Sequence, residues 1–442
     1  MSLVVEQFSG WAEEYRARPL SPEVLHHAKR AVIDWYAALF PGAVVSPAVL
    51  LEKALAEELD RGEARLALGR KATVRAAALI NGSAAHTVEV DDIFRDGIYH
   101  PGAPTISAAL ALAQAGGASG EQFLRAVIAG YEISTRIGAA MGRAHYRYWH
   151  NTGTIGAFGA CAAASELLGL DRKRFAHALA TVATFAAGLQ QTFRTDSMSK
   201  PLHAGRAAEA GVTAALAARE GVSGSLDVIE GEAGFGRAMG DNPDWEKSIN
   251  SLGKDFHICR MTFKNHSCCG HTFAAIDGAL ALQRKMGVAA NDIERVSVGT
   301  YKAALEVAGY EQPRTAAEAR FSLKYVVATA LTHGSVRLAA FEPSRLEDRA
   351  TRSLMERISV SVDQELDSSF PRQRAARVAI AAGGRSGEHL QPTRIGDPDA
   401  PLSDAQLDEK YLELAVPVIG HEKARKLLER LWKLEQSKAI PE

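Results

Sequence analysis

The stretch WHNTGTIGAFGACAAA, residues 149–164, says more about the fold of this chain than any other. Its first residues include His150 and two polar side chains that favour a helix start. The rest is a run of Gly and Ala broken by Ile155 and Phe158. Because small side chains let helix backbones approach closely, the stretch predicts a helix over 154–168 inside a tightly packed bundle.

Helical spacing of apolar residues recurs on both sides of this stretch, over the first 260 residues. Ser21, Pro22 and Glu23 form a start signal, with a capping hydroxyl, a proline at the first helical position and an acid. The helix they begin is predicted to reach about residue 40. Further helices are predicted over 72–86, 103–115, 120–141, 171–187 and 202–220. Alternating, β-branched stretches are nearly absent here, which indicates an all-helical domain.

The pattern changes after about Cys259. Alternating stretches predict strands over 293–300, 357–362 and 377–381, and helices over 272–286 and 316–333 lie between them. A sheet backed by two helices is the simplest arrangement of these elements. Residues 383–402 are rich in Gly, Pro and Asp and are interpreted as a linker, and residues 403–437 return to helix. The predicted domains are a helical one (1–262), an α/β one (263–396) and a C-terminal segment (397–442) that folds back onto the first.

The composition excludes several classes of function. The chain has 442 residues, 47% hydrophobic and 23% charged, as in ordinary globular proteins. Its formal net charge of -1 gives no bulk attraction to nucleic acid or to acidic membranes. Four cysteines are too few for a disulfide scaffold of this length. There is no signal-peptide pattern and no apolar run of about 18 residues, so we expect a cytoplasmic protein without nucleic-acid or membrane partners.

Three basic residues stand at the starts of predicted helices: His100 in YHPGAPT, His150 in WHNTGT and Lys200 in SKPLH. A helix N-terminus offers free N–H groups and a positive dipole end. Brought together, three such ends would form a pocket that attracts carboxylates and moves protons. Taken singly, each has a plainer interpretation as a capped helix start or a solvated lysine.

An acidic cluster precedes His100, with Glu89, Asp91 and Asp92 within four positions. The cluster is either a solvated loop or the source of an acid that orients a histidine and sets its tautomer. Its spacing is not diagnostic of a metal site.

A further cluster, KNHSCCGH at 264–271, lies at the predicted domain junction. With Cys259 it could form a metal or iron–sulfur site, but no Cys-x-x-Cys spacing is present. A cysteine nucleophile and two buried thiols are the other interpretations, and Lys264 with the histidines fits proton transfer better. Tyr325, near the start of another predicted helix, is either a core residue or a phenol that reaches a cleft.

Several of these motifs occur together in one known family. NG at 81–82, His86, EVDD, HPG, WHNTGTIGAFGA, SKPLHAGRAA and ARFSLKY resemble the MmgE/PrpD family in order and spacing. The resemblance implies a large all-helical domain built from both chain ends and a smaller α/β lid. It also implies a homodimer, a cleft between the domains, and no metal or organic cofactor. The family contains 2-methylcitrate dehydratase, cis-aconitate decarboxylase and iminodisuccinate epimerase.

The resemblance also assigns site residues by motif. Three of them depart from the decarboxylase pattern: Glu89 stands in place of Asp, Ile93 in place of Thr and Cys269 in place of His, and the spacing to His100 is one residue longer. These departures argue against decarboxylation of cis-aconitate and leave the general chemistry open. The positions that match in kind are His100, His150, Lys200, Lys264 and Tyr325.

The sequence therefore predicts a mainly α protein that is a cofactor-free, dehydratase-like lyase. Its substrate would be a small di- or tricarboxylate, and the proton would move at the carbon α to a carboxylate. An epimerase of an iminodisuccinate-type dicarboxylate, a cis-aconitate-type decarboxylase and a non-catalytic ligand-binding scaffold are the alternatives. The predicted catalytic residues are His100, His150, Lys200, Lys264 and Tyr325. The predicted substrate-binding or orienting residues are Glu89, Asp91, Asp92, Thr154, His266 and Cys269, and no metal ligand is predicted.

Overall fold

A computed structural model describes residues 3–194 and 197–440 of the chain. The chain divides into two compact units, one of residues 1–262 with 403–442 and the other of residues 263–402. The first is almost entirely helical and the second is α/β, which confirms the mainly α fold with a smaller α/β part. The sequence-based boundary after 396 differs from this division. Residues 397–402 stay with the second unit, where Asp397 pairs with Arg394 at 2.8 Å.

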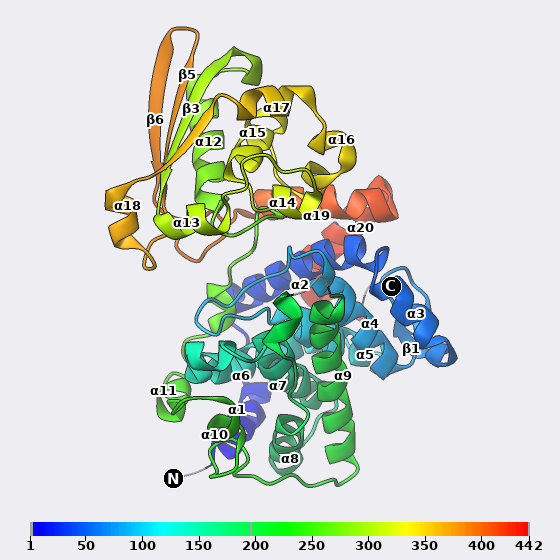
Figure 1. Cartoon of the computed structure of the whole chain (residues 1–442). Helices are drawn as coiled ribbons and strands as arrows, with labels where there is room; N and C mark the ends of the chain where they lie inside the picture. The colour runs from blue at the N-terminus through cyan, green and yellow to red at the C-terminus, as the bar shows by residue number, and fades with distance from the viewer. Residues whose placement is uncertain (1–2, 195–196, 441–442) are drawn as a thin grey trace. The chain divides into compact units, whose positions relative to one another are not determined.

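The helices of the first unit are labelled in Figure 1. They are α1 (Val4–Ala17), α2 (Pro22–Ala43), α3 (Ala48–Ala54), α4 (Val74–Thr87), α5 (Gly102–Gly116), α6 (Gly120–Tyr146), α7 (Asn151–Leu167), α8 (Arg172–Ala183), α9 (Ser199–Arg219), α10 (Phe235–Met239), α11 (Trp245–Ile249), α19 (Asp404–Ile419) and α20 (His421–Trp432). Among the described residues no single helix has the length and apolarity to cross a membrane, and only the bent pair α2 with α3 meets that test jointly.

Helix α7 lies at the centre of the first unit, between α6 and α9 (Figure 1). Its residues from Asn151 to Ser165 are all buried. A Cβ atom at Gly156 would lie 2.5 Å from Pro104 Cγ on α5, closer than real atoms approach. The Gly- and Ala-rich stretch therefore forms the close-packed central helix that the sequence predicts.

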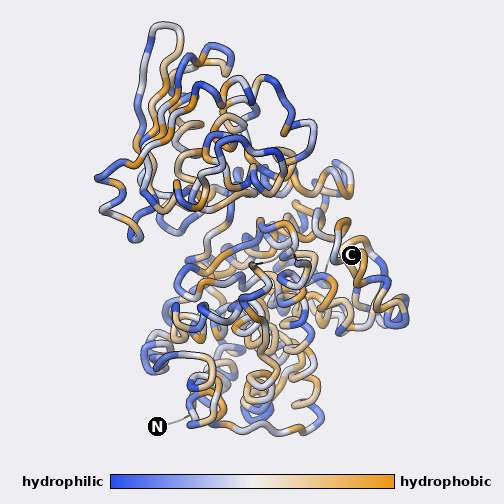
Figure 2. Tube along the Cα trace, viewed as in Figure 1, coloured by the Kyte–Doolittle hydropathy of each residue, from blue (hydrophilic) through white to orange (hydrophobic). Residues whose placement is uncertain are grey.

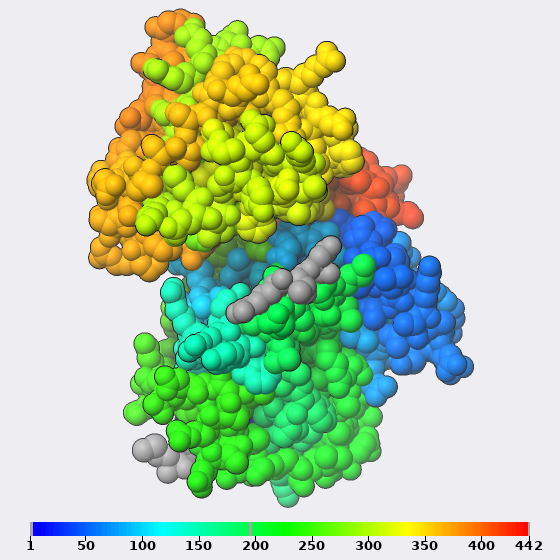
Figure 3. Space-filling view, in the orientation of Figure 1, coloured from blue at the N-terminus to red at the C-terminus, as the bar shows by residue number. Residues whose placement is uncertain are grey.

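The C-terminal segment completes the first unit. Helix α19 packs against α2, and Figure 3 shows this red segment beside the blue N-terminal one. Ser403 accepts a hydrogen bond from the Gln406 N–H and so caps α19. Buried Lys410 donates to Asp34 Oδ1 and to the Val90 carbonyl, both at 2.6 Å. The chain end thus anchors the loop that follows α4.

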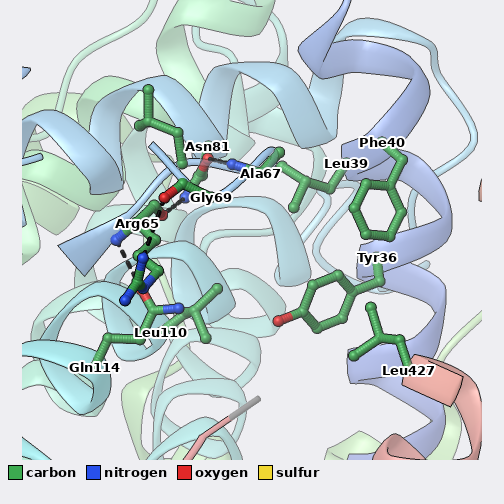
Figure 4. A pocket seen from close by; sticks show the side chains of 11 residues that line it. Tyr36, Leu39, Phe40, Arg65, Ala67, Gly69, Asn81, Leu110, Gln114 and Leu427 are labelled. Carbon is green, nitrogen blue, oxygen red and sulfur yellow. Dashed lines mark hydrogen bonds between the residues drawn. The ribbon is translucent and has the colours of Figure 1, made fainter. Parts of the chain in front are cut away.

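The first unit also contains a two-stranded antiparallel sheet that the sequence analysis missed, of β1 (Leu59–Arg65) and β2 (Lys71–Ala72). Most side chains of β1 are exposed, so the strand lacks an apolar face. A cavity of about 50 Å³ lies beside it, and Figure 4 shows Asn81 holding its wall by bonds to Ala67 N–H and the Arg65 carbonyl. This volume suits a few waters and is too small for a tricarboxylate.

The second unit is a four-stranded sheet with strand order β4-β3-β5-β6. Strand β3 runs parallel to β4 and antiparallel to β5, and β5 runs antiparallel to β6. Helices α12 and α15 pack on the sheet and on each other (Figure 1). The bounds are β3 (Ile293–Thr300), β4 (Ile358–Val362), β5 (Ala376–Ala382), β6 (Arg385–Gln391), α12 (Phe273–Met286), α13 (Lys302–Val307), α14 (Ala316–Ala319), α15 (Leu323–His333), α16 (Pro343–Leu346), α17 (Arg349–Met355) and α18 (Gln364–Ser369).

The linker prediction for 383–402 is wrong over its first part, because β6 lies there. Gly383 and Gly384 have φ angles of 56° and 69° and close a two-residue hairpin between β5 and β6. Strand β6 is at the edge of the sheet and mostly polar, as its blue and white colours in Figure 2 show. The predicted helix over 316–333 is also two helices, and Ser322 caps the second.

Candidate active site

Four histidines lie together at helix ends in the first unit, and we call them the histidine cluster: His86, His100, His150 and His203. His86 is in the last turn of α4, His100 precedes α5, and His150 is the N-cap of α7. The ring of His86 lies 4.7 Å from that of His100 and 5.3 Å from that of His150, centre to centre. The helix starts that the sequence predicts to converge are therefore close neighbours.

Asp91 joins two of these rings. Its Oδ2 lies 2.8 Å from His86 Nδ1 and 3.2 Å from His100 Nδ1. Burial alone would raise the pKa of the Asp91 carboxyl, but the charges and hydrogen bonds of His100 and His86 outweigh it and hold this pKa well below its usual range. The ionised Asp91 accepts a hydrogen bond from His86 Nδ1, and its charge lies in ion-pair contact with the His100 ring. This is the geometry expected of an acid that orients a histidine.

Asp92 has a different role from its neighbour. Its Oδ1 accepts the Gly102 N–H at 3.0 Å, and its Oδ2 accepts the Tyr131 hydroxyl at 2.8 Å. Burial raises the pKa of Asp92 to about 8, and the Asp34 charge adds to the shift. Asp92 therefore fixes the start of α5 and positions His100 through the backbone.

His150 is 2% exposed, and its Nδ1 lies 3.1 Å from Nδ1 of His203. Burial lowers the pKa of His150 well below its usual value, and the positive charges of His86 and Lys200 lower it further. The pKa of His203 is lowered mainly by burial. Both rings are therefore neutral near pH 7 and can act as bases.

Lys200 supplies a cation beside the histidine cluster. It lies in the first turn of α9 and forms an ion pair with Glu89, and its Nζ sits 5.1 Å above the centre of the Phe193 ring. The same Phe193 ring lies 4.8 Å from that of His150. Glu89 adopts a φ of 62°, a left-handed conformation uncommon for a residue with a side chain. A substrate carboxylate at Lys200 would compete with Glu89.

Thr154, a predicted substrate-binding residue, contacts a histidine outside the cluster, and its predicted role stays a prediction. Its hydroxyl lies 2.7 Å from Nε2 of His145, whose Nδ1 bonds to the Met239 carbonyl. The hydroxyl that does contact the cluster belongs to Thr152, which accepts the His100 N–H at 3.2 Å. This bond ties the segment before α5 to the start of α7, and the sequence analysis missed it.

The sequence analysis also missed His203, although a signal was available. Lys200 and His203 are three residues apart on α9, so they share one helix face. His86 was noted only as part of a family motif. Asp91 follows His86 by only five residues, so the sequence offered a local signal for this contact.

The second unit holds four predicted residues: Lys264, His266, Cys269 and Tyr325. Lys264 is half-buried. His266 Nε2 lies 2.9 Å from Asp277 Oδ1, and both side chains are buried. The other Asp277 oxygen accepts the Ile395 N–H at 2.8 Å, so the pair connects α12 to the loop that follows β6. These contacts favour a structural role for His266, and its predicted substrate-orienting role stays a prediction.

Cys269 and Tyr325 are also tied into the second unit. The Cys269 N–H donates to the Arg320 carbonyl at 3.0 Å, and burial raises the pKa of its thiol, which disfavours a nucleophilic thiolate. Tyr325 is fully buried and its hydroxyl donates to the Ala340 carbonyl. Of its two sequence-based interpretations, these contacts favour the core residue, and the catalytic roles of Lys264 and Tyr325 stay predictions.

His86, Asp91 and His100 are also of the type that binds metal ions, and their ligand atoms lie within 4.8 Å of one another. The His86 Nδ1–Asp91 distance is that of a direct hydrogen bond, and the His100 Nδ1–Asp91 distance is that of an ion-pair contact. That these residues bind no metal stays a prediction.

Comparisons with known proteins agree with the motifs. The MmgE/PrpD N-terminal domain matches residues 6–248, and the MmgE/PrpD C-terminal domain matches residues 266–435. The chain is 28% identical to the cis-aconitate decarboxylase-like protein oryM of Aspergillus oryzae, over 99% of the chain and 96% of that protein. It is 26% identical to human cis-aconitate decarboxylase, over 81% of the chain and 76% of the relative. It is 26% identical to 2-methylcitrate dehydratase of Salmonella typhimurium, over 53% of the chain and 51% of the relative.

Proposed function

The chain belongs to the MmgE/PrpD family, and we propose that it is a lyase that moves a proton at the carbon α to a carboxylate of a small di- or tricarboxylate. The observation that carries this proposal is the histidine cluster around Asp91. It places neutral imidazoles, a buried carboxylate and the Lys200 cation at converging helix starts.

The cluster contains the groups that this chemistry requires. His100, oriented by Asp91, or His150, kept neutral by burial, removes the proton as a general base. The N-terminal ends of α5, α7 and α9, together with Lys200, bind the carboxylates and spread the negative charge that develops on the substrate. Positioned acid–base groups contribute roughly 10²–10⁴ in rate each.

Two lyase reactions are candidates for the exact activity of this protein. A hydro-lyase expels hydroxide from the intermediate, and a decarboxylase loses carbon dioxide. Glu89, Ile93 and Cys269 depart from the decarboxylase pattern, which favours the hydro-lyase. The relatives that match nearly the whole chain are named as decarboxylases or as decarboxylase-like, so decarboxylation is the second candidate.

One experiment separates these reactions. The protein is incubated in deuterated water with citrate, 2-methylcitrate, cis-aconitate or iminodisuccinate, and carbon-bound hydrogen is followed by NMR. A hydro-lyase gives an alkene product, a decarboxylase releases carbon dioxide, and an epimerase gives label uptake with no change of mass otherwise. If all four compounds stay unchanged while tricarboxylates raise the melting temperature, the protein is a binding scaffold and the proposal is wrong.

We also propose that the enzyme is a homodimer that needs neither metal nor organic cofactor, as the resemblance implies. Sedimentation should then give twice the chain mass of 47.3 kDa. Activity should survive dialysis against a strong chelator. Loss of activity that returns on adding back a divalent metal would assign the His86, Asp91 and His100 group to metal binding instead.

A further inference from the structure

His203 makes a contact that the proposed chemistry has not used. Its Nδ1 faces Nδ1 of His150 at 3.1 Å, which is a hydrogen-bond distance. Two nitrogens of the same kind satisfy each other only if one carries a hydrogen and the other presents a lone pair. The two rings must therefore be opposite tautomers whenever both are neutral.

The surroundings of the pair are shaped to hold this contact. A Cβ at Gly188 would lie 3.1 Å from His203 Nδ1, and a Cβ at Gly153 would lie 3.0 Å from His203 Cβ, so side chains at these positions would crowd the His203 ring. The Gly188 carbonyl also accepts the His150 N–H at 2.9 Å, which fixes the backbone that carries the ring. The packing therefore favours one arrangement of the two imidazoles.

The two rings differ in access to water. His150 is 2% exposed, whereas His203 is only partly buried. His203 also lies three residues after Lys200 on α9, with its side chain on the same helix face. A proton that reaches the buried ring has a neighbouring imidazole through which it can leave.

We propose that His203 is a positioning residue for His150 that sets its tautomer and relays its proton. This inference rests on the proposed function of the cluster. In the base step, the substrate carbon gives its proton to Nε2 of His150. The proton on Nδ1 of His150 passes to Nδ1 of His203, and Nε2 of His203 releases its proton to water. The electron pair stays on the substrate carbon, so the charges balance.

The first test needs no substrate. Long-range ¹H–¹⁵N spectra report which nitrogen of each histidine is protonated. At neutral pH, one ring of the pair should carry its hydrogen at Nδ1 and the other at Nε2, and His203→Asn should change the nitrogen shifts of His150. Finding both rings in the same tautomer would overturn the pairing, whatever the enzyme acts on.

The second test uses turnover. His203→Phe fills the slot without a hydrogen bond, and we expect kcat to fall by about 10²-fold, the range of one proton-transfer group, with a smaller change in KM. His203→Asn keeps a hydrogen-bonding group beside His150 and should lose less. At acidic pH, where His203 becomes protonated, its positive charge opposes the protonation of His150. Removal of His203 should therefore raise the pKa of His150 and move the acidic limb of kcat/KM to higher pH.

A matched control and a rescue complete the design. His177 is also partly buried in the first unit, where its Nδ1 bonds to the Gly224 carbonyl, and His177→Asn should leave kcat and the pH profile unchanged. Free imidazole should restore part of the activity of His203→Ala. If His203→Phe does not fold, the His203→Asn variant and the imidazole rescue still test whether His203 relays the proton. A folded variant with wild-type kcat and pH profile would overturn the relay, and an inactive wild type would count against the proposed function alone.

Discussion

The two units each contain a buried histidine–aspartate pair, and the difference between the pairs separates chemistry from support. In the first unit, one oxygen of Asp91 contacts two imidazoles, while its Oδ1 has no hydrogen-bond partner among the residues that the structure describes. In the second unit, Asp277 uses one oxygen for His266 and the other for the Ile395 N–H. We propose that the same residue types serve the chemistry in the first unit and support the fold in the second.

Exposure and strain follow the same division. The His100 side chain is 15% exposed, next to a half-exposed ion pair and to Glu89 in its left-handed conformation. The His86–Asp91 and His266–Asp277 pairs are both almost fully inaccessible, so the difference lies in His100 and Lys200, which stay partly exposed beside the first pair. Polar groups that stay partly exposed at converging helix ends are accessible to a substrate, whereas buried polar pairs more often stabilise the fold.

The largest expected effect is on kcat and comes from a change in the His86–Asp91 pair. Asp91→Asn keeps the shape of the side chain but removes the charge that holds both imidazole tautomers. We expect kcat to fall by roughly 10²–10⁴-fold, measured by steady-state kinetics on whichever compound the NMR panel identifies. Its circular dichroism spectrum should match that of the wild type. A variant with near-normal kcat would remove Asp91 from the chemistry.

The matched change in the His266–Asp277 pair should affect stability instead of kcat. Asp277→Asn weakens the bonds to His266 and Ile395 inside a buried site. We expect the free energy of unfolding of the second unit to fall by about 1–3 kcal/mol, measured by urea denaturation. The kcat of the folded fraction should stay close to that of the wild type. A large loss of kcat without a loss of stability would place His266 in the active site after all.

Tyr325→Phe tests whether the second unit supplies a catalytic phenol. If the hydroxyl only bonds to the Ala340 carbonyl, removing it should cost about 0.5–1.5 kcal/mol of stability. Turnover should then change little. A loss of kcat of about 10²-fold or more would instead support the proton-donor role that the resemblance implies.

A further effect is expected on the pH dependence of stability. Burial raises the pKa of Asp92 from 3.8 to about 8. Between these two pH values the folded protein keeps a proton that the unfolded chain releases, so stability should fall as the pH rises. Asp92→Asn removes this titration. The free energy of unfolding of the variant should therefore decrease less than that of the wild type between about pH 5 and about pH 8. Equal slopes for the two proteins would contradict the shifted pKa.

Local patterns in the sequence were sufficient for much of the fold. Capping residues and apolar spacing located most helices, because those signals act within a few residues. Strand β6 was missed since its exposed edge carries polar residues, although the Gly383–Gly384 pair is a hairpin signal. Strand β1 was missed for the same physical reason, an absence of an apolar face.

The candidate site was predictable only in part. The motif positions of His100, His150 and Lys200 could be proposed from helix-start signals, and the structure brings their helix ends together. The contacts of His86 with His100, and of His150 with His203, depend on how α4, α5, α7 and α9 pack. No local pattern encodes those tertiary distances.

The most direct test of the central claim is solvent-deuterium uptake by the wild type and by His150→Ala, on the substrate found in the panel. The claim is that the histidine cluster moves a proton at a carbon beside a carboxylate. We predict that wild-type protein and the His177→Asn control exchange that hydrogen, while His150→Ala, folded to the same melting temperature, does not. Exchange at the wild-type rate in His150→Ala would contradict the account.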